Sequence, residues 1–272
     1  MESHRPQSRL AYRAGRWESG TRMVPTEVPV ALVFNGTTQA VMMASPADLI
    51  DFGRGFSLTE GMISDISEIR DIEIVAQDQG LEVRIWLAPE AEARFQERRR
   101  AQVGPVGCGL CGIDSLTEAM RPLPVLPAAD QHLTPADAEA AMAGLARLQA
   151  LNATTRAAHA AGYYLPGQGV ILAREDVGRH NALDKLAGAM AAQGLDASGG
   201  ALVITSRVSV DMVQKAAMIS AGVLMAASAP TALAIEQAES AGITLVAVLR
   251  GADFELFTHP ERFTGGKTAD VA

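Results

Sequence analysis

Short apolar runs alternate with helical stretches from residue 170 onward, and this alternation constrains the fold more than any other feature of the chain. The helical stretches cover 181–193, 209–220 and 231–241, and the apolar runs are VILA at 170–173, ALVIT at 201–205, VLMAA at 223–227 and TLVAVL at 244–249. Repeated strand–helix–strand units form a largely parallel sheet with helices on its faces. We therefore expect an α/β domain in the C-terminal part of the chain.

Polar and cationic residues follow each of these apolar runs. They are Arg174-Glu175-Asp176, Ser206-Arg207, Ser228-Ala229-Pro230-Thr231 and Arg250-Gly251. Ligands of such sheets bind in the crevice at the carboxyl ends of the strands, and small, polar and cationic residues suit a bound phosphate or nucleotide. The sequence therefore predicts a binding site at this edge of the sheet.

Residues 25–106 have the pattern of a smaller α+β domain. Two apolar runs within 28–44 flank Asn35-Gly36, a pair that tolerates the positive φ of a tight hairpin turn. The alternating segments 69–76 and 81–88 suit a second hairpin.

A helix and a charged connector are expected in the same unit. Ser45 and Pro46 suit the N-cap and the first position of a helix that runs to about Gly61. The stretch 90–106, with three consecutive arginines at 98–100, is expected to be a solvated connector.

The rest of the chain divides into tails, a linker and the α/β domain. Residues 1–24 carry arginines at 5, 9, 13 and 16 with few apolar partners, so we expect a disordered basic tail, with a basic docking arm as the alternative. The remaining divisions are a Cys-x-x-Cys loop with a proline-rich linker at 107–135, the α/β domain at 136–263, which opens with a helix at 136–151, and a tail at 264–272.

The overall charge argues against nucleic acid as a partner. The chain of 272 residues has 23 Lys and Arg against 31 Asp and Glu, a net charge of −8, so any anion site must be local. No run of about 18 apolar residues and no signal-peptide core occurs. We expect a cytoplasmic protein that binds no membrane.

Both cysteines of the chain lie in GCGLCG, as Cys108 and Cys111. Two cysteines are too few for a disulfide framework, so redox, metal or nucleophile chemistry is expected. The surrounding glycines would let a thiolate swing between two partners. Three alternatives stay open: a zinc site made of four cysteines across a dimer, a thioredoxin-like dithiol, and a structural turn.

A second polar segment, EDVGRHNALDK at 175–185, lies where a strand meets a helix. Asp176 can cap the helix, and His180 and Asp184 form an i,i+4 pair that could orient the imidazole. With Arg179, Asn181 and Lys185 nearby, the segment predicts a binding or acid–base site. His159 is a weaker candidate because its neighbours are alanines.

Five ordered motifs together resemble the formate dehydrogenase accessory sulfurtransferase family, FdhD. They are GCGLCG, EDVGRHNALDK, TSRVSVDMVQKA, ASAPTALAIEQA and TLVAVLRG, and the resemblance covers residues 25–263. It implies a two-domain protein whose C-terminal domain has a three-layer, cytidine-deaminase-like α/β fold without zinc chemistry and without a permanent metal.

The resemblance also implies a sulfurtransferase. Cys108 would take sulfur from a cysteine desulfurase as a persulfide and pass it to the molybdenum or tungsten of bis-molybdopterin guanine dinucleotide. The sulfurated cofactor would then enter the catalytic subunit of formate dehydrogenase. Cys111 would assist by thiol exchange.

The cofactor-binding stretch of the family matches Val248, Leu249, Arg250, Gly251, Ala252 and Asp253. Further contacts are expected from Ser206, Arg207, Ser228, Thr231, His180, Asp176 and Asn181. Two guanine nucleotides on one cofactor suit a homodimer with two equivalent pockets. Many family members carry Thr-Gly-Gly where this chain has Thr155-Arg156-Ala157, which lowers the rank of His159.

Two functions of another class remain as alternatives. One is a zinc-bridged dimeric scaffold that binds formate dehydrogenase without chemistry. The other is a guanine-nucleotide-binding regulator whose cysteines sense redox state.

Overall fold

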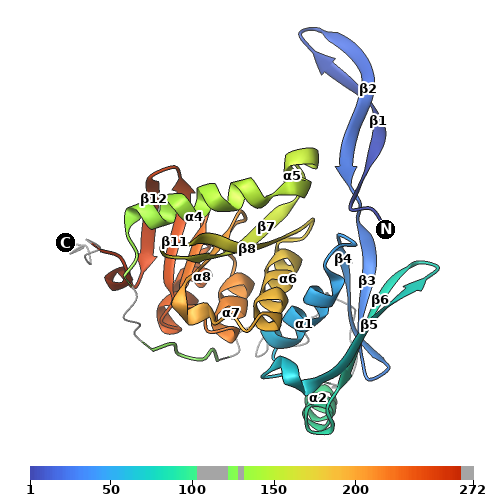
Figure 1. Ribbon diagram of the computed structural model, residues 1–272, viewed down its shortest axis with the longest axis vertical. Helices are drawn as coiled ribbons and strands as arrows, with labels where there is room; N and C mark the ends of the chain where they lie inside the picture. Colours follow the sequence, from blue (N-terminus) through green and yellow to red (C-terminus); the bar gives the residue numbers. More distant parts are fainter. Residues whose placement is uncertain (103–121, 128–131, 265–272) are drawn as a thin grey trace.

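The computed structural model describes residues 1–102, 122–127 and 132–264 (Figure 1). Cys108 and Cys111 lie outside the described residues, as does most of the stretch 107–135 that we expected to be a loop and linker. Of the expected C-terminal tail, only Thr264 is described.

A six-stranded sheet forms the centre of the C-terminal unit, in the order β12-β11-β10-β9-β7-β8. The central strands β9 (Ala201–Ile204), β10 (Val223–Ala226) and β11 (Thr244–Arg250) are parallel. The outer strands β7 (His159–Leu165), β8 (Gly169–Asp176) and β12 (Asp253–Thr258) pair antiparallel. The expectation of a largely parallel sheet is therefore wrong at its borders, because β7–β8 and β11–β12 are hairpins with short turns.

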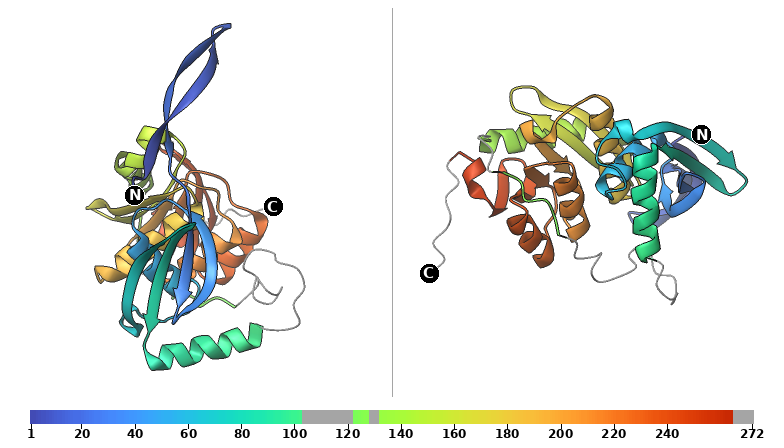
Figure 2. Two further views of the ribbon diagram at one scale, coloured as in Figure 1. Left: turned by 90° about the vertical axis from the view of Figure 1, so that its right-hand side faces the viewer. Right: turned by 90° about the horizontal axis from the view of Figure 1, so that it is seen from below.

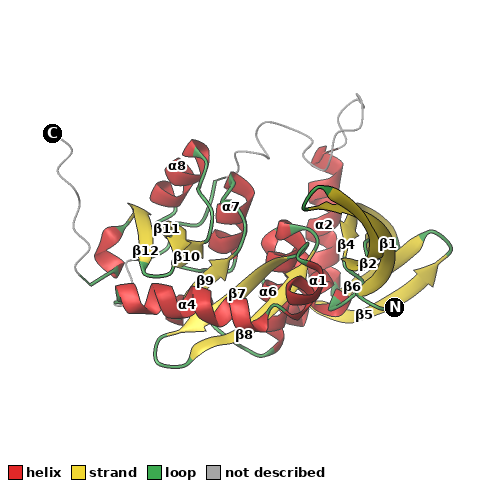
Figure 3. Ribbon diagram, turned by 90° about the horizontal axis from the view of Figure 1, so that it is seen from above, coloured by secondary structure: helices red, strands yellow, loops and turns green. Residues whose placement is uncertain are grey.

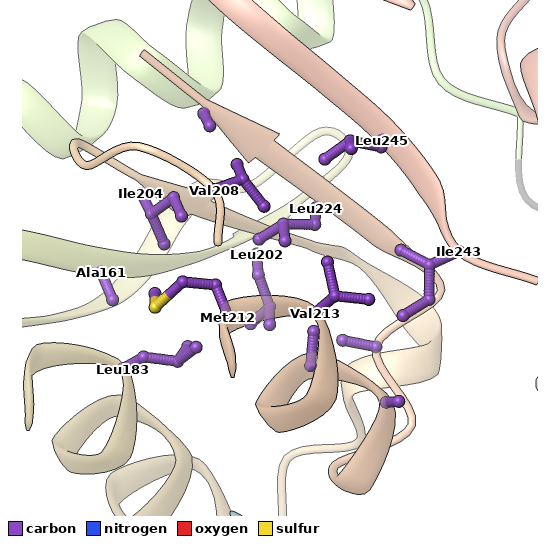
Figure 4. Close-up of a cluster of buried hydrophobic side chains, with 14 of the residues drawn as sticks. Ala161, Leu183, Leu202, Ile204, Val208, Met212, Val213, Leu224, Ile243 and Leu245 are labelled. Carbon is purple, nitrogen blue, oxygen red and sulfur yellow. The ribbon is translucent and has the colours of Figure 1, made fainter. Parts of the chain in front are cut away.

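Helices cover both faces of this sheet (Figure 3). On one face lie α6 (Arg179–Ala192), α7 (Val210–Met218) and α8 (Ala232–Ser240), and α4 (Pro135–Leu148) lies on the other. Leu183 and Met212 pack on Leu202 and Leu224 on the first face (Figure 4), and Leu145 packs on the opposite face. The expected α/β fold with three layers is confirmed.

The expected helices and strands of this unit are present with small shifts of their ends. Thr134 and Asp137 form a capping box at the start of α4, which ends at Leu148 and is followed by the short helix α5 (Ala150–Thr155). Short 3₁₀ turns complete the unit at Ala197–Gly199 (η2) and Pro260–Arg262 (η3). Within the described ranges, no helix is long and apolar enough to cross a membrane.

The N-terminal unit is a four-stranded sheet with the helix α1 (Leu49–Thr59) on one face. The strand order is β4-β3-β6-β5, and the strands are β3 (Val28–Phe34), β4 (Thr37–Ala44), β5 (Ile69–Gln77) and β6 (Gly80–Leu87). Asn35 and Gly36 have φ of 44° and 80°, so the Asn-Gly turn forms as expected. Both predicted hairpins are confirmed.

Two expectations for this unit are corrected. Helix α1 starts at Leu49 with Asp48 as its N-cap, not after Ser45, because the N–H of Ser45 donates to Asp176 Oδ2 of the other unit at 2.9 Å. Helix α2 (Pro89–Gln102) covers most of the stretch 90–106 that was expected to be a connector. Ala91 and Phe95 of α2 are buried in the core of the N-terminal unit, which gives this charged helix an apolar contact. The 3₁₀ turn η1 (Ile66–Glu68) precedes β5.

The two units are joined where α1 crosses α6 (Figure 1). A Cβ on Gly55 would lie 1.6 Å from the carbonyl oxygen of Asp184, and one on Gly188 would lie 1.9 Å from that of Asp51. Only glycine fits at these two positions, so the helix backbones approach closely. The units therefore share a rigid packed joint.

The first residues of the chain form a hairpin, which corrects the expected disordered tail at 1–24. Strands β1 (His4–Arg13) and β2 (Arg16–Pro25) pair along their whole length. Ala14 and Gly15, both at positive φ, make the turn. The ribbon stands out from the rest of the molecule (Figures 1 and 2). Its low hydrophobicity hid the strands from sequence analysis.

Candidate functional site at the carboxyl edge of the sheet

The structure brings the predicted strand-end residues to one edge of the C-terminal sheet. Strands β8, β9, β10 and β11 run in the same direction and end at this edge, where β7 begins. Helices α6, α7 and α8 also begin there. The positive ends of their helix dipoles therefore point toward the same rim.

Three loops follow β9, β10 and β11 at this edge, and we call them the rim loops. Backbone hydrogen bonds connect these rim loops. The N–H of Val208 donates to the Ala229 carbonyl at 3.3 Å, and the N–H of Thr231 donates to the Val208 carbonyl at 3.0 Å. The N–H of Val248 reaches the Ser228 carbonyl at 3.4 Å. Thr231 also caps α8 through its hydroxyl. The rim is thus held in place before any ligand arrives.

The predicted stretch 248–253 ends β11 and turns into β12. Val248 has a φ of 55°, which is an unfavourable conformation for a β-branched residue, and it lies where the pairing register with β12 shifts. Such strain concentrates at functional sites. Leu249 is buried in the core, so its side chain is not available to a ligand. Arg250, Gly251, Ala252 and Asp253 are exposed.

This edge can bind an anion. Arg207 and Arg250 are exposed there, whereas Ser206 is buried and donates to the Arg207 carbonyl at 3.1 Å. The N-caps of α6 and α7, Gly178 and Ser209, make no side-chain capping bond. Helix N-termini without side-chain caps and nearby guanidinium groups are the usual partners of phosphate groups.

His180 faces the joint between the units rather than its expected partner Asp184. Its Nε2 lies 3.8 Å from Asp211 Oδ2 and has no hydrogen-bond partner among the described residues. Burial, together with the charges of Arg179 and Lys215, lowers the pKa of His180 to about 4. The imidazole is therefore neutral at pH 7.

Asp184 instead belongs to a buried cluster at the joint. Thr59 donates to Asp184 at 2.6 Å, and Lys215 Nζ lies 2.8 Å from Asp184 and 2.5 Å from Glu60. Burial raises the pKa of Asp184 to about 6 against the pull of Lys215. Burial also disfavours the charge of Lys215, but Asp184 and Glu60 outweigh it and raise the pKa of Lys215.

Asp176 forms a second buried cluster that joins the units. Its carboxylate accepts from the N–H groups of Ser45 and Gly178, from Asn181 Nδ2 at 2.9 Å and from Lys185 Nζ at 2.6 Å. Asp176 is 0% exposed and Asn181 2% exposed. We therefore assign both to the interface between the units, in place of the helix cap and the ligand contact that the sequence predicted.

Sequence analysis missed the residues that complete this interface. Lys215 lies in the motif TSRVSVDMVQKA, and its position before an alanine-rich stretch gave no sign of a buried charge. Arg174 Nη2 lies 2.7 Å from Asp51 Oδ2 across the same joint. The sequence placed Arg174 among the strand-end residues expected to suit a bound phosphate or nucleotide, whereas its ion pair with Asp51 assigns it to the joint.

His159 lies at the same edge as the rim loops. It begins β7 and pairs in register with Asp176. Burial and the charge of Arg179 lower the pKa of His159. Arg156, the middle residue of Thr155-Arg156-Ala157, has a φ of 55° and ends α5.

The segment after the cysteines is held at the opposite edge of the sheet. The N–H of Leu126 donates to the Ala241 carbonyl at 2.9 Å, just after α8 ends. In the described part of the chain, no group of three acidic or histidine side chains is placed to hold a metal ion. Cys108 and Cys111, the expected ligands of a zinc site across a dimer, lie outside the described residues.

Comparison with known proteins gives one consistent result. The model of the FdhD/NarQ family matches residues 25–264. A "Sulfur carrier protein FdhD" of Agrobacterium fabrum is 54% identical over 260 residues, which is 96% of this chain and 96% of that protein. A protein of the same name from Cupriavidus necator is 48% identical and covers 94% of this chain and 91% of its own length.

A solved structure has the same fold. The protein comes from Desulfotalea psychrophila and is named a "putative formate dehydrogenase accessory protein". It is 26% identical to this chain with a TM-score of 0.74, and the match covers 97% of this chain and 100% of that one.

Proposed function

Because this chain belongs to the FdhD/NarQ family, we propose that it carries sulfur as a persulfide on Cys108 to a molybdenum or tungsten cofactor needed by formate dehydrogenase. The observation that carries the proposal is the 54% identity, over 96% of the chain, to a protein named as a sulfur carrier. The donor is a cysteine desulfurase, and the acceptor protein is the catalytic subunit of formate dehydrogenase.

The transfer consists of two thiol-exchange steps. The Cys108 thiolate attacks the outer sulfur of the desulfurase persulfide, so that one sulfur–sulfur bond forms as another breaks and the desulfurase regains its thiolate. In the second step the Cys111 thiolate attacks the inner sulfur of the Cys108 persulfide, so that a Cys108–Cys111 disulfide forms, the outer sulfur leaves as sulfide, and the metal of the cargo takes this sulfide as a ligand. Cys111 thus assists by thiol exchange and, together with Cys108, supplies the two electrons that reduce the outer sulfur to sulfide.

The cargo is bis-molybdopterin guanine dinucleotide, and the carboxyl edge of the sheet supports its binding. Arg207, Arg250 and the starts of α6 and α7 supply positive charge and N–H donors for pyrophosphate. Ser228, Thr231 and the exposed turn at 251–253 surround the same rim. A homodimer would offer one such edge to each guanine nucleotide.

The experiment that tests the proposal is the intact mass of the protein after incubation with a cysteine desulfurase and cysteine. We expect a gain of about 32 Da, one sulfur, on the wild type. The gain is lost in Cys108→Ala and kept in the matched variant Cys111→Ala.

Two outcomes contradict the proposal. One is wild-type protein that gains no sulfur while the desulfurase is shown to be active, which favours the zinc-bridged or redox-sensing scaffold. The other is an equal gain of sulfur on the Cys108→Ala variant.

A further inference from the structure

A groove lies on the side of the molecule away from the rim, where the ends of three helices meet. Its volume is about 390 Å³. Helices α6 and α7 begin at the rim and end at this groove, and α6, with 14 residues, is about 21 Å long. The end of α1 and the segment 64–66 form the wall on the side of the N-terminal unit. A molecule bound in the groove therefore leaves the rim free.

The floor of the groove is apolar. Ala187 and Met190 of α6 line it and are each 2% exposed. Leu58 of α1 and Met218 of α7 also line it and are half-buried. Methionine is unbranched and fills irregular gaps, so this floor can adapt to an aliphatic chain. The groove therefore suits a ligand with an apolar stem rather than a bare ion.

The mouth of the groove is acidic. Asp65 and Asp196 line it and are exposed. Hydrogen bonds from the side chain and the N–H of Ser67 lower the pKa of Asp65, and those of Ser198, whose hydroxyl donates to Asp196 Oδ2 at 2.6 Å, lower the pKa of Asp196. Both carboxylates are therefore ionised at pH 7.

No positive charge of the groove balances these carboxylates. Among the described residues that line it, none is a lysine, an arginine or a histidine. The ends of α6 and α7 add the negative poles of their helix dipoles. The last turn of α6 holds no basic residue, and Lys215, in the last turn of α7, is paired with Asp184 and Glu60. The groove therefore favours a cation.

Ser220 holds a hydroxyl at the mouth in a strained conformation. Both α6 and α7 are followed by a residue at positive φ, 65° at Gly194 and 60° at Ser220. The N–H groups of these two residues donate to the carbonyls of Ala191 and Ala217, each at 3.0 Å. Glycine is the usual residue at this position, because a Cβ is strained there. Such strain concentrates at functional sites, and Ser220 is an exposed residue of the groove.

We propose that this groove is the docking site for an arginine side chain of a partner protein. The guanidinium group, with its five N–H donors, binds the carboxylates of Asp65 and Asp196 and the hydroxyl of Ser220. Its aliphatic stem lies on Met190 and Met218.

The shape and charge of the groove favour this occupant. Because Asp65, Asp196 and Ser220 are exposed, the groove is open at its mouth, so a side chain can enter while its main chain stays outside. Arginine is also among the residues that contribute most to binding energy at interfaces, and the net charge of −8 attracts cationic partners. The inference is independent of sulfur transfer.

The test uses the full chain with ¹³C-labelled methionine methyl groups and NMR. The probe is Nα-acetyl-arginine methylamide, an arginine without charged ends. The methyl signals of Met190 and Met218 are assigned with the variants Met190→Leu and Met218→Leu. We expect both signals to shift with a Kd on the order of 1 mM. The citrulline analogue, which has the same shape but no charge, should bind at least about tenfold more weakly.

Variants test the residues of the mouth. The double variant Asp65→Asn, Asp196→Asn should bind the arginine probe roughly tenfold more weakly. The control Asp78→Asn, Glu139→Gln, which neutralises two exposed carboxylates outside the groove, should bind as the wild type does. Ser220→Gly, which keeps the turn, should weaken binding roughly threefold.

Four outcomes overturn the proposal. The first is the absence of any shift at Met190 and Met218 up to the solubility limit of the probe. The second is equal binding of the arginine and citrulline probes, and the third is unchanged binding in the double variant of Asp65 and Asp196. The fourth is binding of free agmatine more than about 100-fold tighter than the arginine probe, which would make the groove a site for a small molecule.

Discussion

Arg156 occupies a backbone conformation that suits glycine. Its φ of 55° and ψ of 35° are left-handed, and its N–H donates to the Asn152 carbonyl at 2.7 Å to close α5. The left-handed conformation costs a residue with a Cβ roughly 1–2 kcal/mol. The turn therefore forms although the sequence departs from Thr-Gly-Gly, and the cost is backbone strain at Arg156, three residues before His159.

Replacing Arg156 with glycine should stabilise the protein. We expect Arg156→Gly to raise the free energy of unfolding by roughly 0.5–1 kcal/mol, because the greater freedom of glycine in the unfolded chain offsets part of the relieved strain. Urea unfolding measures the change. Arg156→Ala is the matched control, since it removes the same side chain but keeps the strain. Equal stability of the two variants would contradict the explanation.

At the scale of elements, the rim owes its geometry to three loops that follow parallel strands. Parallel pairing brings the ends of β9, β10 and β11 to one edge, and the hydrogen bonds from Val208, Thr231 and Val248 hold the loops together. This arrangement places Arg207 and Arg250 on loops that are far apart in the sequence but belong to one rim.

The rim should bind a guanine nucleotide through these two arginines. With GDP as the probe in calorimetry, we expect Arg207→Ala and Arg250→Ala each to weaken binding by roughly tenfold, because a charge-assisted hydrogen bond to phosphate is lost. Arg147→Ala is the control, an exposed arginine on α4. If all three variants bind GDP as the wild type does, the nucleotide binds elsewhere.

At the scale of the whole molecule, buried charge joins the two units into one. Lys185 with Asp176 and Lys215 with Asp184 are buried pairs that connect α6 to the N-terminal unit through Ser45 and Thr59. Removing one partner of a buried pair commonly costs about 3–5 kcal/mol. The units are therefore expected to unfold together rather than one at a time.

This joint should also make stability depend on pH. The folded-state pKa of His180 is about 4, below its ordinary value of 6.5, so the unfolded chain binds more protons between these values and stability falls as the pH drops through this range. The pKa of Asp184, raised to about 6 from 3.8, acts in the opposite direction in an overlapping range.

The variant His180→Gln separates the two contributions. Between pH 7.5 and pH 5, we expect the wild type to lose on the order of 1–2 kcal/mol more than His180→Gln in urea unfolding. His132→Gln, at an exposed histidine, should behave as the wild type. An identical pH dependence for wild type and His180→Gln would show that His180 is protonated as easily in the folded chain as in the unfolded one.

The sequence by itself determined the features that depend on neighbouring residues. Periodicity predicted the strands and helices from residue 170 onward, and Asn35-Gly36 predicted its hairpin because the turn needs positive φ at both positions. The order of strands and helices was also enough to place the polar strand ends at one edge.

Only the tertiary structure decided what those polar residues contact. Within EDVGRHNALDK, Asp176, Asn181, Asp184 and Lys185 are buried at the joint, because α1 packs against α6 there. Helical spacing shows which side chains share a face, but it does not show what packs on that face. Likewise, Arg5, Arg9 and Arg13 share one face of β1, because pairing with β2 holds this segment in an extended strand.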